Sequence, residues 1–104
     1  MGRADTAAEH FKLGLTVAEK DGDLRAQSFL LREYAQMQSE CGDHVEALSL
    51  LQSAAKHAKS TGFAFERKRV ALQLAALFEE TGDYKLAVEQ HKLAWRLQSE
   101  TRVR

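Results

Sequence analysis

Histidine and cysteine are the side chains of this sequence best suited to metal binding or nucleophilic chemistry. The four histidines, His10, His44, His57 and His91, form no H-E-x-x-H pattern and no other spacing typical of metal ligands. Cys41 is the only cysteine, so no internal disulfide can form, and nothing near it indicates a histidine partner or an oxyanion site. We therefore expect a protein without metal, cofactor or catalytic activity.

Arg67-Lys68-Arg69 is the densest cluster of charge in the chain. These residues fall near the start of an expected helix, where positive charge opposes the helix dipole and costs about 0.3–1 kcal/mol. An acidic group or a ligand would offset that cost, and a solvated helix start is the alternative. Over the whole chain, fifteen Lys and Arg balance fifteen Asp and Glu. This balance favours neither nucleic acid nor an anionic membrane as a partner.

The composition is typical of one modest all-helical domain. The 104 residues are 44% hydrophobic, contain no proline, and consist mainly of good helix formers such as Ala, Leu, Gln, Glu, Lys and Arg. No apolar run approaches eighteen residues, and no charged-then-apolar leader opens the chain. The sequence therefore predicts no membrane span and a cytoplasmic location, which a single cysteine also fits.

Five amphipathic helices are expected, separated by turns that contain glycine and aspartate. Thr6 with Glu9, and Asp43 with Glu46, have the spacing of capping boxes, in which each side chain binds a free backbone N–H at a helix start. Apolar residues recur three and four positions apart between the turns. The expected helices cover residues 6–20, 24–41, 44–60, 63–81 and 84–101.

A repeat of forty residues relates the two halves of the chain. The shift places Gly42-Asp43 on Gly82-Asp83 and aligns small residues that suit close helix contacts. A period of this length indicates stacked helical repeats. We divide the single domain 1–104 into a half-repeat helix (6–20) and two repeats (24–60 and 63–101), and expect it to belong to a longer array. The aligned alanine pairs are Ala18 and Ala58, Ala35 and Ala75, Ala47 and Ala87, and Ala54 and Ala94.

These residues resemble the tetratricopeptide repeat family. The family has a small residue and an aromatic residue in its first helix, a Gly-Asp-Tyr type turn, and two alanines in its second helix. The resemblance implies an all-α fold of antiparallel helix-turn-helix repeats stacked in a right-handed superhelix. It departs from the family in its longer period, about forty rather than thirty-four, and in lacking the closing proline. The matching residues are Ala75, Phe78, Gly82, Asp83, Tyr84, Ala87 and Ala94, with a weaker copy at Ala35, Gln38, Gly42, Asp43, His44, Ala47 and Ala54.

The resemblance also implies where a partner would bind. In the family, first-type helices line a concave groove that holds a peptide or protein. Arg32, Gln36, Arg69 and Gln73 would then bind a peptide carboxylate or backbone. The asparagines of the family's carboxylate clamp are absent. The implied groove positions are Phe29, Arg32, Glu33, Gln36, Arg69, Leu72, Gln73 and Ala76.

Two functions follow as expectations. The first is a non-enzymatic module that binds a peptide or protein in the groove. The second is a sensory or connector segment, and a dimerisation segment, of a larger bacterial signalling protein. The long-helix repeats resemble those placed before a diguanylate cyclase domain.

Leu86, Leu93 and Leu97 form a leucine stripe on the last expected helix, spaced seven and four residues apart. Their counterparts in the earlier copy are the polar residues Glu46, Ser53 and His57. We expect the stripe to be exposed and to dock on a second copy, giving a homodimer, or on a downstream segment. The alternative is that the last turn, with Val103, folds back over it.

Overall fold

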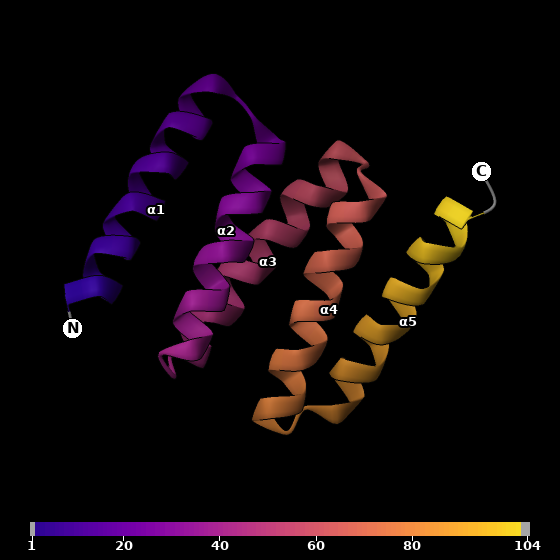
Figure 1. Cartoon of the computed structure of the whole chain (residues 1–104). Helices are drawn as coiled ribbons and strands as arrows, with labels where there is room; N and C mark the ends of the chain where they lie inside the picture. Colours follow the sequence, from indigo (N-terminus) through magenta and orange to yellow (C-terminus); the bar gives the residue numbers. More distant parts are fainter. Residues whose placement is uncertain (1, 103–104) are drawn as a thin grey trace.

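A computed structural model describes the backbone of residues 2–102 and the side chains of residues 6–100. Within residues 2–102 the chain forms five α-helices and no strand, which confirms the all-α prediction (Figure 1). The helices begin and end within a few residues of their predicted bounds, except that α1 starts four residues earlier. They are α1 (Gly2–Asp21), α2 (Leu24–Glu40), α3 (His44–Thr61), α4 (Ala64–Thr81) and α5 (Tyr84–Arg102).

Left-handed glycines close the turns between helices. Gly42 and Gly82 have φ angles of 89° and 85°, a region that residues with a Cβ rarely adopt. After each glycine, the next N–H donates to the carbonyl five residues earlier, which is the 6→1 bond of the Schellman pattern. Asp43 N–H donates to the Gln38 carbonyl at 2.9 Å, and Asp83 N–H donates to the Phe78 carbonyl at 2.8 Å. The turn between α2 and α3 and the turn between α4 and α5 are therefore closed in the same way.

The predicted capping boxes are only partly present. Asp43 is the N-cap of α3, and its carboxylate accepts the Glu46 N–H at 3.1 Å. The reciprocal bond to the Asp43 N–H is prevented because that N–H already donates to Gln38. The Thr6 and Glu9 prediction places the start of α1 too late, because α1 begins at Gly2 and Thr6 lies inside it.

Neighbouring helices pack antiparallel along the chain (Figure 1). α2 packs mainly on α3 and α4 mainly on α5, which makes two helical hairpins. α1 packs on α2, α3 packs on α4, and α2 also touches α4. The molecule is flat, with extents of 43 × 35 × 16 Å. α2 and α4 run parallel, so their N-terminal ends lie on one side. A right-handed superhelix remains a prediction.

The alanines aligned by the forty-residue shift lie in the core. Both members of each aligned pair are buried, and Ala47, Ala54, Ala58 and Ala75 have no exposed surface. Small side chains at these positions let the helices approach closely, and larger residues such as Leu51, Leu74 and Phe78 fill the space between them. The repeat identified in the sequence therefore corresponds to a repeat in the packing of the core.

Enlarging these alanines should destabilise the fold. Ala75→Leu and Ala87→Leu are each expected to lower the free energy of unfolding by about 1–3 kcal/mol, because both side chains are buried and the added methylenes overpack the contact. Urea unfolding measures the change. Ala76→Leu is the matched control, since Ala76 is exposed on the same helix. Equal stability of the three variants would contradict the assigned packing.

Candidate functional site

The eight groove positions lie on the two parallel helices α2 and α4. Phe29, Leu72 and Ala76 are exposed, and so are Gln36 and Arg69. Glu33 and Gln73 are half-buried, and Arg32 is buried. The helices that the sequence assigned to the groove thus meet, and most of the assigned side chains reach solvent. We call this surface the α2/α4 face.

Arg32 differs from its predicted role as a ligand-binding residue. Its Nε donates to Glu66 Oε2 at 2.8 Å and one Nη to Glu33 Oε2 at 3.1 Å. The guanidinium also lies 5.3 Å from the centre of the Phe29 ring. Only 6% of the residue is exposed. Because its charge is already paired within the chain, Arg32 joins α2 to α4 instead of presenting a free charge to a ligand.

Polar contacts extend this link along the two helices. Gln73 Nε2 donates to the Arg32 carbonyl at 3.3 Å and to Gln36 Oε1 at 3.4 Å. Ser28, which is fully buried, donates to the Ala54 carbonyl at 3.2 Å and contacts Glu66 Oε2 at 3.4 Å. In the described side chains no buried nitrogen or oxygen lacks a hydrogen-bond partner. This satisfied network sets the spacing of α2 and α4 below the exposed residues.

Aromatic residues at the N-terminal end of the face were missed by the sequence reasoning. Phe63 and Phe65 are 41% and 52% exposed, which is unusual for such large apolar side chains. The Arg25 guanidinium lies 4.2 Å from the Phe63 ring centre, and the Arg69 guanidinium lies 4.8 Å from that of Phe65. The position of these phenylalanines near the start of a helix was the signal that could have revealed them.

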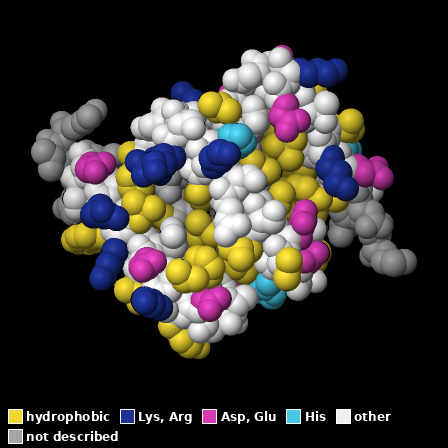
Figure 2. All heavy atoms as spheres, turned by 180° about the vertical axis from the view of Figure 1, so that it is seen from behind, with side chains coloured by type: hydrophobic (Ala, Val, Ile, Leu, Met, Phe, Trp, Pro, Cys, Tyr) yellow, Lys and Arg dark blue, Asp and Glu magenta, His cyan; other side chains and the backbone are white. Residues whose placement is uncertain are grey.

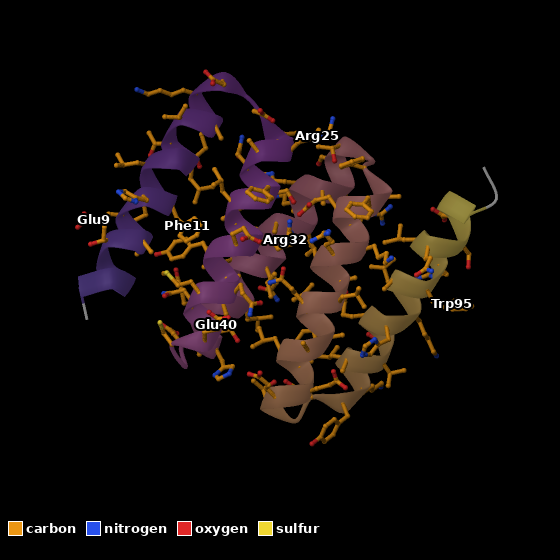
Figure 3. The ribbon with its side chains drawn as sticks, in the orientation of Figure 1. Glu9, Phe11, Arg25, Arg32, Glu40 and Trp95 are labelled. Atoms are coloured by element: carbon orange, nitrogen blue, oxygen red, sulfur yellow. The ribbon has the colours of Figure 1, made fainter. Side chains whose placement is uncertain are left out.

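Charge is unevenly distributed along the α2/α4 face. Arg25 and Arg69 are exposed towards the N-terminal ends of the two helices, and Glu40 and Glu80 are exposed at their C-terminal ends. Figure 3 shows Arg25, Arg32 and Glu40 in this order along α2. Helix N-termini carry partial positive charge and C-termini partial negative charge. The side chains and the helix dipoles therefore both make the N-terminal end of the face positive and its C-terminal end negative. Glu80 also contacts His44 Nε2 at 2.7 Å.

The leucine stripe predicted on α5 is not continuous on the surface. Leu97 is 2% exposed and Leu93 is half-buried, while Leu86 is 41% exposed. Among the described helices α5 packs only on α4. Val103 lies outside the described residues. The large exposed apolar residues of α5 are Tyr84, Leu86, Val88 and Trp95.

Apolar surface is not confined to one side of the molecule. The side opposite to Figure 1 shows hydrophobic side chains at the surface between charged ones (Figure 2). A pocket of about 290 Å³ lies between α3, α4 and α5, and Lys59 and Arg67 are its cationic members. The sequence reasoning did not identify this pocket, because its walls come from three helices. The other lining residues are Ala55, Val70, Ala71, Leu74, Gln90 and Leu93.

Three further findings bear on function. Within the described residues, no group of three or more His, Cys, Asp or Glu side chains has a geometry that could hold a metal ion. None of the described helices combines the length and the apolar character needed to cross a bilayer. Comparisons of the chain with protein-family models, curated proteins and solved structures returned no match.

Proposed function

We propose that this chain is a non-enzymatic module that binds a peptide or protein segment across the α2/α4 face. The observation that carries the proposal is a set of exposed apolar side chains, Phe29, Phe65 and Leu72, beside the exposed cation of Arg69. Aromatic and arginine side chains of this kind are enriched at the energetic centres of protein interfaces. Such residues on the surface of two packed helices favour binding of a partner segment.

The chemistry of the face defines the partner. An apolar side chain of the partner would pack against Phe29, Phe65 and Leu72, and an adjacent carboxylate would pair with Arg69. A basic residue towards the other end of the segment would meet Glu40. The partner is therefore a segment with an apolar centre, an acidic end and a basic end.

The buried network supports this role without touching the partner. Arg32, Glu66 and Ser28 hold α2 and α4 together, so the exposed side chains above them need little ordering when a partner binds. A preorganised surface loses less conformational entropy on association than a mobile one. Arg32 is thus a positioning residue in the proposed module.

A peptide-selection experiment tests the proposal. A random phage-displayed peptide library is selected against the wild-type protein, and enriched peptides are titrated by fluorescence anisotropy. We expect them to carry a carboxylate close to a large apolar residue. Phe65→Ala with Arg69→Glu should weaken their binding about tenfold or more, because the variant loses an apolar contact and reverses a charge.

A variant on another helix provides the control. Val45 is 84% exposed on α3, and Val45→Ser should leave the affinity of the selected peptides unchanged. Circular dichroism of the Phe65→Ala, Arg69→Glu variant checks that its helices persist. The proposal fails if no peptide is enriched, or if the enriched peptides bind this variant as tightly as they bind the wild type.

A second candidate function is a connector or dimerisation segment of a larger signalling protein. It is favoured by the exposed apolar residues of α5, which give that helix surface for a further contact. The coding sequence on both sides of this chain tests it. A regulatory or output domain joined directly to the chain would support the connector function, and the absence of any adjoining domain would oppose it.

A further inference from the structure

The side of α5 turned away from α4 carries a second exposed surface. Trp95 is 67% exposed, and Figure 3 shows it on this outer side of the helix. Val88 is 51% exposed. Together with His91, Lys92 and Arg96, these two residues line an open pocket of about 510 Å³. We call these five residues the α5 outer face.

Earlier copies of this surface occur twice in the same chain. The forty-residue shift that aligns the buried alanines also aligns the outer face with positions on α3 and α1. In the two earlier copies the equivalents of His91 and Trp95 are buried or half-buried. The equivalents are Leu51 and Phe11 for His91, and Ala55 and Leu15 for Trp95.

A following antiparallel helix covers part of each earlier copy, while the equivalents of Lys92 and Arg96 there stay exposed. On α1, Phe11 stacks on Tyr34 of α2 with ring centroids 5.4 Å apart. On α3, Ala55 lines a pocket together with Val70 and Leu74 of α4. Each covering helix presents apolar residues four positions apart, Leu30 and Tyr34 on α2 and Val70 and Leu74 on α4. The α5 outer face therefore lies where, in both earlier copies, an amphipathic helix packs.

The charge of the α5 outer face selects among possible helices. Its cationic members are Lys92 and Arg96, and its third polar member, His91, has its Nε2 3.6 Å from Glu79 Oε1 of α4. No carboxylate lines the pocket itself. Two copies of this face brought together would place like charges opposite one another. A helix that carries carboxylates beside its apolar ridge would instead be complementary.

We propose that the α5 outer face binds an amphipathic α-helix of a partner protein, antiparallel to α5, with an apolar ridge flanked by carboxylates. Trp95 stands where α3 has the much smaller Ala55, so the indole offers the partner more apolar surface than the equivalent position offers on α3. This site is separate from the α2/α4 face and does not depend on the function proposed for that face.

Trp95 supplies the measurement, because it is the only tryptophan in the chain. The probe is a synthetic peptide with the sequence of residues 64–81, the helix that covers the equivalent surface of α3, carrying Arg67→Glu, Lys68→Glu and Arg69→Glu. The peptide contains no tryptophan. Binding should shift the emission of Trp95 to shorter wavelength as the indole leaves water. The basic peptide, which keeps the native Arg67, Lys68 and Arg69, should bind about tenfold more weakly.

Variants of the protein locate the binding. Val88→Glu should lower the affinity for the acidic peptide about tenfold or more. Val45→Glu, on the exposed surface of α3, should leave that affinity unchanged. Lys92→Glu with Arg96→Glu should reverse the preference between the acidic peptide and the basic one. A reversal of this kind would show that the charges act directly.

Three results would overturn the proposal. The first is an acidic peptide that leaves the emission of Trp95 unchanged up to its solubility limit. The second is a peptide that binds the wild type and Val88→Glu with equal affinity. Such a peptide would bind elsewhere on the protein, for example in the position that α4 occupies. The third is a shift of Trp95 emission with protein concentration alone, together with a dimer in sedimentation, which would assign the face to a second copy.

Discussion

Replacing Arg32 with methionine is expected to lower the free energy of unfolding by about 3–5 kcal/mol. The variant leaves the Glu66 carboxylate buried between α2 and α4 without its cation, and breaking one side of a buried ion pair has an effect of this size. Only 8% of the Arg32 side chain and 11% of the Glu66 side chain are exposed, so water does little to screen the unpaired charge. Urea unfolding followed by circular dichroism measures the loss.

A double variant separates the burial of charge from the loss of contact. Arg32→Met with Glu66→Leu removes both charges, and it should recover most of the lost stability, since apolar residues of similar volume often replace a buried pair without cost. Glu33→Gln is the control, because Glu33 pairs with the same guanidinium but its side chain is 44% exposed. Its effect should be at most about 1 kcal/mol. A loss for Arg32→Met as small as that of Glu33→Gln would contradict the buried pairing.

Leu74→Ala is expected to lower the free energy of unfolding by about 2–5 kcal/mol. Leu74 is buried in the core with Val70, Leu77 and Phe78, and its truncation removes apolar contacts and leaves unfilled space. The lower half of the range is expected, because Leu74 also borders the pocket of about 290 Å³. The new space joins that open pocket, where water can enter, and does not become a sealed cavity. Thermal and urea unfolding both measure the change.

The matched control lies two residues away on the same helix. Leu72→Ala removes the same atoms from a side chain that is 40% exposed, so its effect on stability should be clearly smaller than that of Leu74→Ala. Leu72 belongs to the α2/α4 face. This variant should therefore lower the affinity for a peptide bound there, although it changes the stability of the protein little. If the two variants were equally destabilised, the assignment of these α4 residues to core and surface would be wrong.

The helices, their turns and much of the core could be predicted from the sequence. These features depend on local preferences: good helix formers between turns, left-handed glycine at positions such as Gly42 and Gly82, and an aspartate N-cap such as Asp43. The forty-residue repeat then identified Ala75 and Ala87 as buried, because small residues recur where helices approach. Helix α1 was the exception, since its start at Gly2 lacks such a boundary signal.

The pairing of charged residues was decided by the tertiary structure. Arg32 and Glu66 are 34 residues apart, and the copies of these positions, Leu72 and Ala26, are apolar. A comparison of the repeats therefore contains no sign of the ion pair. The ion pair forms because α2 and α4 lie side by side where these two residues face each other. Arg32, expected to bind a ligand, instead links the two helices.

The exposure of side chains on α5 was also decided by the tertiary structure. The sequence placed Leu97 in an exposed stripe because its counterpart, His57, is polar, yet Leu97 is buried. Trp95 has the opposite outcome, because the surface that α4 covers on α3 has no covering helix on α5 among the described residues. The type of a residue indicates whether burial of its side chain would stabilise the protein. Whether the side chain is buried depends on which helix packs beside it.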